Sequence, residues 1–106
     1  MDRKEYLIRK LREFASKSSE RIDIVKMIFF GSMAMGEAHK ESDIDLIIVS
    51  PSFREVSFWK RAIGLHDYWD LDYPVDFLCF TPEEFEKKSR GVTIISEAIK
   101  EGIEIT

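Results

Sequence analysis

The sequence predicts an α+β fold in which helices and strands alternate in the order α-β-α-β-α-β-α. Three observations predict it: an amphipathic first segment with helical spacing, three short apolar runs, and a strong helix start after the third run. The 106 residues are expected to form one domain, residues 1–106, with a small mixed sheet flanked by helices.

The first half of the chain is expected to form a helix, a strand, a short helical turn and a second strand, over residues 2–18, 22–30, 33–38 and 44–50. Leu7, Leu11 and Phe14 recur at helical spacing, and Asp2 can cap the first helix. The first strand ends at Gly31. The second strand is apolar on both faces, which predicts a central place in the sheet.

The second half is expected to form a helix, a third strand, a helix interrupted near Gly91 and a short edge strand, over residues 53–68, 74–80, 81–100 and 103–106. Ser52 and Glu55 can cap the first of these helices, and Thr81 with Glu84 forms a capping box for the second. The helices are expected to pack mainly on one face of the sheet.

Composition excludes several classes of protein. Sixteen Lys and Arg residues against 20 Asp and Glu residues give a net charge of −4, which argues against a binder of duplex nucleic acid. No apolar run approaches the ~20 residues that a membrane span needs. The N-terminus does not resemble a secretory leader, so a cytoplasmic protein is expected. The single cysteine, Cys79, lies in an apolar run and is expected to be a buried, inert thiol.

A Gly-Ser pair at the end of the first strand is a candidate phosphate site. Gly31 allows a sharp turn and close approach of a ligand, and backbone N–H groups after Ser32 favour an anion. The serine hydroxyl adds one more donor. Taken alone, the pair is better explained as a helix N-cap.

Three aspartates are the candidate metal ligands. Asp43 and Asp45 are two residues apart at the start of the second strand, so their side chains are expected on one face. Paired carboxylates repel unless a cation lies between them, and hard oxygen ligands suit Mg²⁺ or Mn²⁺. The alternative is an ordinary polar turn. Asp76 lies among apolar residues of the third strand and completes the set if the two strands are neighbours.

Gly31-Ser32, ten further residues and then Asp43-Ile44-Asp45 match a Gly-Ser-x10-Asp-x-Asp signature. In this the chain resembles the DNA polymerase beta-like nucleotidyltransferases, and its size is similar to that of the minimal nucleotidyltransferase (MNT) branch. Asp76 falls where that superfamily places its third carboxylate. The resemblance covers the whole chain and implies the nucleotidyltransferase fold.

The resemblance also implies an activity: Mg²⁺- or Mn²⁺-dependent transfer of a nucleoside monophosphate, AMP from ATP, to a hydroxyl acceptor, with release of pyrophosphate. It implies that Gly31 and Ser32 hold the β- and γ-phosphates and that Asp43 and Asp45 bind the metals. Asp76 would bind one metal and help to deprotonate the acceptor hydroxyl.

Minimal members of the family commonly pair with an all-helical HEPN protein as toxin–antitoxin systems, in which the nucleotidyltransferase attaches AMP to a tyrosine of the toxin. The resemblance therefore implies a HEPN-type partner and a tyrosine acceptor. A second hypothesis is an antitoxin that acts by binding its partner, with little or no catalysis. A third is a metal-binding domain without transfer activity, against which Gly31-Ser32 counts.

Two further features bear on the ligand and the partner. Many minimal members carry arginine where this chain has Met35, and His39 or Lys40 is a candidate replacement cation. Large apolar residues are dense over 59–73; core packing accounts for most of them. The rest predict a surface for a partner or for a homo-oligomer.

Overall fold

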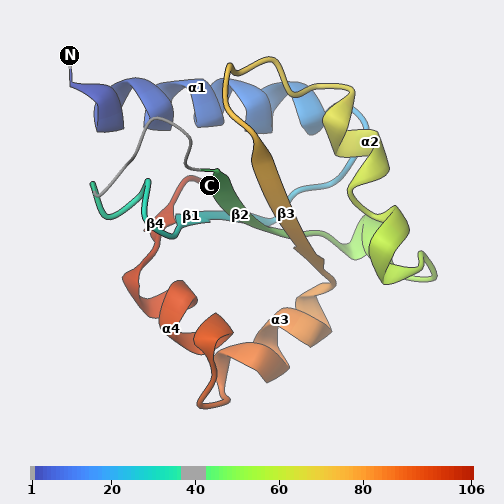
Figure 1. Ribbon diagram of the computed structural model, residues 1–106. Helices are drawn as coiled ribbons and strands as arrows, with labels where there is room; N and C mark the ends of the chain where they lie inside the picture. Colours follow the sequence, from blue (N-terminus) through green and yellow to red (C-terminus); the bar gives the residue numbers. More distant parts are fainter. Residues whose placement is uncertain (1, 37–42) are drawn as a thin grey trace.

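The computed structural model describes residues 2–36 and 43–106, which form helices around a four-stranded sheet (Figure 1). Two 3-10 helices, Pro51–Phe53 and Phe58–Lys60, precede α2. The helices are α1 (Arg3–Ser18), α2 (Ile63–His66), α3 (Pro82–Ser89) and α4 (Ile94–Glu101), and the strands are β1 (Lys26–Phe30), β2 (Ile44–Val49), β3 (Val75–Phe80) and β4 (Ile103–Glu104).

The sheet is mixed, with the strand order β3-β2-β1-β4. β1 runs antiparallel to both β2 and β4, whereas β2 and β3 are parallel. The α+β fold, the central place of the second strand and the short edge strand at the C-terminus are therefore confirmed. β1 begins at Lys26 rather than at residue 22.

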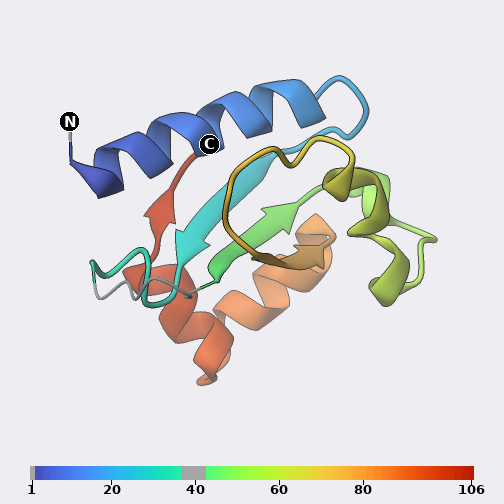
Figure 2. The ribbon, with the colours of Figure 1, turned by 45° about the horizontal axis from the view of Figure 1, so that its top comes forward.

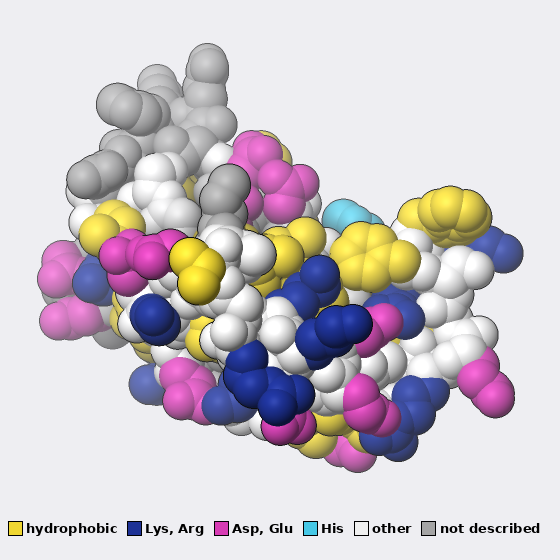
Figure 3. Space-filling model, turned by 90° about the horizontal axis from the view of Figure 1, so that it is seen from below, with side chains coloured by type: hydrophobic (Ala, Val, Ile, Leu, Met, Phe, Trp, Pro, Cys, Tyr) yellow, Lys and Arg dark blue, Asp and Glu magenta, His cyan; other side chains and the backbone are white. Residues whose placement is uncertain are grey.

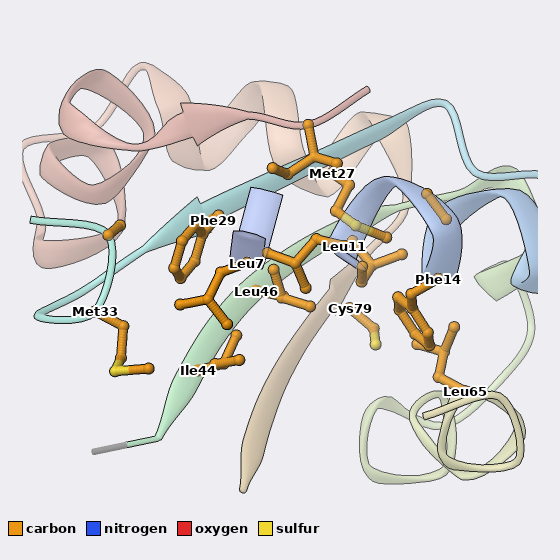
Figure 4. Close-up of a cluster of buried hydrophobic side chains, with 14 of the residues drawn as sticks. Leu7, Leu11, Phe14, Met27, Phe29, Met33, Ile44, Leu46, Leu65 and Cys79 are labelled. Carbon is orange, nitrogen blue, oxygen red and sulfur yellow. The ribbon is translucent and has the colours of Figure 1, made fainter. Parts of the chain in front are cut away.

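Helices cover both faces of the sheet, so the expectation of one covered face was wrong (Figure 2). On one face, Leu7, Leu11 and Phe14 of α1 pack against Met27, Phe29 and other side chains of the sheet (Figure 4). On the other face, α3 and α4 cover Ile28, Ile47, Val49 and Phe80 with Phe85, Ile95, Ala98 and Ile99. The apolar residues of β2 alternate between these two faces, so each face needs its own cover.

The predicted helix over residues 53–68 is also wrong, because only Ile63–His66 is α-helical. Ser50, not Ser52, caps the turn at Pro51, where its hydroxyl accepts from the Ser52 N–H at 3.0 Å. Glu55 has a φ of 65°, which a right-handed helix does not allow. The break between α3 and α4 near Gly91 is confirmed.

The buried guanidinium of Arg61 holds this irregular segment against the sheet. Only 8% of its side chain is exposed. It donates to the backbone carbonyl of Val56 at 3.0 Å, to that of Cys79 at 3.1 Å, and to the Glu84 carboxylate at 2.6 Å. One side chain thus joins the segment, β3 and α3, and its buried charge is paired as burial requires.

Cys79 lies on β3 with 2% of its surface exposed. Burial raises the pKa of its thiol to about 12, so it stays protonated and unreactive at neutral pH, as expected. Among the described helices, none has the length and apolarity needed to cross a membrane.

We predict that Glu84→Gln destabilises the fold by about 1–2 kcal/mol, because it removes the charge that Arg61 is paired with. The substitution keeps the capping-box geometry, since glutamine can accept the same bond from Thr81 N–H. The matched control is Glu83→Gln, which breaks the exposed pair with Arg54 and should change stability little. Urea unfolding of the three proteins at neutral pH tests this.

The same pair makes a prediction about acid. The hydrogen bond from Arg61 lowers the pKa of Glu84 below its ordinary value of 4.5. Its stabilisation is therefore complete above pH 4.5 and is lost as the pH falls through the lower pKa of the folded state. The stability gap between wild type and Glu84→Gln should be constant above that pH and shrink below it. A gap independent of pH would contradict the assigned pairing.

Candidate phosphate and carboxylate site

Gly31 lies directly against the Asp45 carboxylate. It follows β1 with a φ of +84°, a left-handed conformation that favours glycine. A Cβ added at Gly31 would collide with Oδ2 of Asp45. The register of the sheet explains the contact, since Phe30 and Asp45 are opposite each other in the β1–β2 pair. The first residue of the candidate phosphate loop therefore shares one small space with a candidate metal ligand.

Asp45 and Asp76 lie side by side on neighbouring parallel strands, as register partners in the β2–β3 pair. Parallel strands are roughly 4.8 Å apart. Asp45 shares a face with Ile47 and Val49, and Asp76 shares the same face with Leu78, so both carboxylates are on the side of α3 and α4. The structure thus brings these two predicted residues together.

The three aspartates influence one another electrostatically. Burial raises the pKa of Asp45, and repulsion by Asp76 and by Asp43 raises it further. Asp45 is half-buried, whereas Asp43, just before β2, and Asp76 are exposed. Among residues 2–36 and 43–106, no Lys, Arg or His lies within ion-pair distance of any of them. Negative charge therefore collects at this edge, and no cation from residues 2–36 or 43–106 pairs with it.

This donor set fits a hard divalent cation that takes part of its ligands from a substrate. In the described part of the chain, no three His, Cys, Asp or Glu side chains are close enough together to hold a metal ion by themselves. Mg²⁺ seldom needs such a cage, because one or two carboxylates with substrate phosphates and water complete its shell. Asp45 and Asp76 supply carboxylates of this kind, and Asp43 lies close by.

The loop after Gly31 is a turn over residues 32–36 rather than the expected helix over 33–38, of which residues 37 and 38 lie outside the described residues. Within this turn, the N–H of Met35 donates a hydrogen bond to the Gly31 carbonyl at 3.1 Å. Within the described ranges, no backbone carbonyl accepts from the N–H groups of Ser32, Met33 or Ala34. Successive unpaired N–H groups of this kind suit an anion.

Met35, which replaces the arginine of many minimal members, lies beside Gly31 with 56% of its surface exposed. A depression of ≈ 290 Å³ adjoins the loop, and its described lining includes Glu97 and Glu101 but neither Lys nor Arg. The candidate replacement cations His39 and Lys40 lie outside the described residues. Along the described lining, a phosphate would meet backbone N–H groups without a cationic side chain.

The aromatic stretch divides as the sequence suggested. Leu65, Tyr68, Trp69, Leu71 and Tyr73 pack in or against the main core. Phe58, Trp59 and Ile63 stay exposed at 52%, 79% and 64%. Sequence reasoning missed Phe58, which lines a cavity described below together with Lys87 and Lys88. Only the fold brings Phe58 and these lysines together, because 29 residues separate them.

We predict that Gly31→Ala disturbs Asp45, whereas Gly36→Ala does not. Both glycines have positive φ, so alanine costs about 1–2 kcal/mol at each. A Cβ at Gly36 meets nothing within 4 Å in the described structure, which makes Gly36→Ala the matched control. Gly31→Ala should cost more, and the excess should disappear in an Asp45→Ala background. Equal losses for both variants in urea unfolding would contradict the contact.

Comparison with known structures agrees with the fold. A proposed nucleotidyltransferase from Sulfolobus solfataricus has a similar structure, with a TM-score of 0.63, 17% identity, and coverage of 86% of this chain and 89% of that chain. A toxin–antitoxin structure determined with AMP-PNP has a TM-score of 0.58, 19% identity, and coverage of 90% and 72%. At such identities the likeness shows a shared fold.

No curated protein matches the chain. A family model described as the nucleotidyltransferase domain matches residues 8–105. This match spans nearly the whole chain and includes Gly31, Ser32 and all three aspartates. Together with the shared fold, it shows that the chain belongs to the nucleotidyltransferase domain family.

Proposed function

We propose that this protein transfers AMP from ATP to a hydroxyl group on a protein partner. The observation that carries the proposal is the pairing of Asp45 with Asp76 beside Gly31. The turn after Gly31, whose N–H groups have no backbone partner within the described ranges, suits the phosphates, and the adjacent carboxylates suit the reacting α-phosphate. The family match supports nucleotidyl transfer in general.

In this proposal, Gly31 and the N–H groups that follow it hold the β- and γ-phosphates, and the Ser32 hydroxyl donates a further hydrogen bond. Asp43 and Asp45, together with Asp76, would hold Mg²⁺ or Mn²⁺. When bound, the cation supplies positive charge that neutralises the triphosphate and stabilises the charge that develops during transfer.

Asp76 comes from the outer strand of the sheet and faces the acceptor side. Its carboxylate orients the acceptor hydroxyl and accepts its proton. The hydroxyl oxygen forms a bond to the α-phosphorus, while the bond from that phosphorus to the bridging oxygen breaks. Pyrophosphate leaves with the electron pair of the broken bond, and AMP remains on the acceptor.

The proposal also specifies the partner protein and the residue that accepts AMP. One protein of the same fold is known in a toxin–antitoxin structure with AMP-PNP. We therefore propose a helical HEPN-type toxin as partner and one of its tyrosines as acceptor. Exposed Phe58, Trp59 and Ile63 offer apolar surface for association. The second candidate function, neutralisation by binding alone, is favoured by the same surface and by the absence of a cation at Met35.

We predict different effects for the two central aspartates. Asp76→Asn should retain binding of ATP with Mg²⁺ and lose transfer by about 10²–10⁴-fold, because it removes the proton acceptor. Asp45→Asn should weaken both binding and transfer. Calorimetry with Mg²⁺–ATP, and labelling of the co-purified partner from α-phosphate-labelled ATP, measure the two quantities.

The control is Asp23→Asn. Asp23 is exposed and precedes the start of β1, whereas Gly31 follows the end of that strand. The substitution should leave both quantities unchanged. Full transfer by Asp76→Asn would refute the role assigned to that residue. A native protein that binds the partner but neither binds Mg²⁺–ATP nor labels the partner would leave the binding-only antitoxin as the better account.

We also predict that Met35→Arg tightens binding of ATP by about fivefold, since it adds one exposed charge beside the phosphate loop. The gain should fall with added salt because the new contact is exposed to solvent. Met35→Gln is the matched control for side-chain length without charge. If both variants bind ATP equally well in calorimetry, the triphosphate does not lie against this loop.

A further inference from the structure

A cavity lined by residues of β3, α3 and α4 lies on the same face of the sheet as Asp45 and Asp76. It has a volume of ≈ 620 Å³. Leu78 and Phe80 of β3 line it together with Phe58, Ile95 of α4, and Lys87 and Lys88 of α3. Neither the candidate phosphate loop nor the three aspartates contribute to its lining.

We propose that this cavity, the acceptor groove, docks a segment of the acceptor protein that carries a tyrosine flanked by acidic residues. The proposal rests on the proposed function and adds the chemistry of its partner. Leu78 follows Asp76 by two residues, so it lies on the same face and roughly 7 Å further along the strand. An aromatic side chain that enters from the groove therefore approaches Asp76.

The order of the strands puts the groove on the acceptor side. The phosphate loop follows β1, Asp45 lies on β2, and Asp76 lies on β3 at the edge of the sheet. In an in-line displacement, the incoming hydroxyl arrives opposite the leaving pyrophosphate. With the β- and γ-phosphates at Gly31 and Ser32, the hydroxyl must come from the β3 side, where the groove lies.

The apolar lining suits an aromatic anchor. Phe80 is buried, whereas 52% of Phe58 is exposed, and their ring centroids are 6.0 Å apart. Trp59 follows Phe58 in the same 3-10 helix and is 79% exposed. Aromatic side chains grouped around a concave apolar surface are typical of the centres of protein interfaces.

The positive charge of Lys87 and Lys88 beside this lining favours acidic residues on either side of the docked tyrosine. Lys87 and Lys88 have no carboxylate within ion-pair distance in the described part of the chain, and Lys88 Nζ lies 5.5 Å from the centre of the Phe80 ring. Glu84 also lines the groove, but its carboxylate is bound by Arg61. On this face, hydrophobic side chains border Lys and Arg side chains that are interspersed with Asp and Glu side chains (Figure 3).

The test uses two synthetic polypeptides as probes, a random Glu-Tyr copolymer and a random Lys-Tyr copolymer, each fluorescently labelled for anisotropy titration. Wild type should bind the Glu-Tyr copolymer more tightly. Lys87→Glu with Lys88→Glu should weaken that binding by about tenfold or more, because two favourable charges become repulsive. Phe58→Ala should weaken it without changing its salt dependence.

The matched control is Lys4→Glu with Arg12→Glu, which makes the same change of net charge on α1, on the opposite face of the sheet. It should leave copolymer binding unchanged. Because these titrations contain no nucleotide, they report on the groove even if Mg²⁺–ATP binding and transfer both fail, which would instead count against the proposed function. If the control double variant lost copolymer binding to the same extent, the effect would come from net charge alone, and the proposal would be overturned.

A parallel calorimetric titration with Mg²⁺–ATP tests the alternative that the cavity binds the nucleoside of ATP instead of the acceptor segment. Groove variants that bind ATP as wild type does, yet lose the Glu-Tyr copolymer, support an acceptor groove. Groove variants that lose ATP and keep the copolymer would show that the cavity receives the nucleoside, and the proposal would be wrong. Equal binding of both copolymers by wild type would overturn it as well.

Discussion

The strand β2 is the element on which the rest of this molecule depends. It pairs with β1 on one side and with β3 on the other, and Leu46, Ile47 and Ile48 have no exposed surface. Since its apolar side chains point to both faces, α1 must cover one face while α3 and α4 cover the other. The same strand carries Asp45 at its beginning, so the packing that makes the core also fixes the candidate site.

The candidate site is a consequence of register. Antiparallel pairing puts Asp45 opposite Phe30, directly before the turn at Gly31, and parallel pairing puts it beside Asp76. Three segments distant in sequence are thereby joined at one edge of the sheet. The arrangement has a cost, since burial and the neighbouring Asp76 and Asp43 raise the pKa of Asp45.

The outer strand, β3, contributes to two regions of this face. Asp76 belongs to the carboxylate edge, whereas Leu78 and Phe80 of the same strand belong to the apolar groove. Arg61 stabilises this outer strand through the Cys79 carbonyl and ties it to α3 through Glu84. The strand that carries Asp76, Leu78 and Phe80 is thus tied to α3 by the buried guanidinium of Arg61.

The sequence by itself determined the existence and order of the strands, the caps at Asp2 and Thr81, the central place of β2 and the residues of the signature from Gly31 to Asp45. These follow from local patterns: apolar runs, capping residues and fixed spacing. Tertiary structure alone decided that Asp76 lies beside Asp45, that both faces of the sheet are covered, and that residues 53–68 contain only one turn of α-helix. It also decided that Phe58 joins Lys87 and Lys88 in one groove. The physical reason is that these features depend on contacts between distant segments, such as Arg61 with Glu84, which no local pattern encodes.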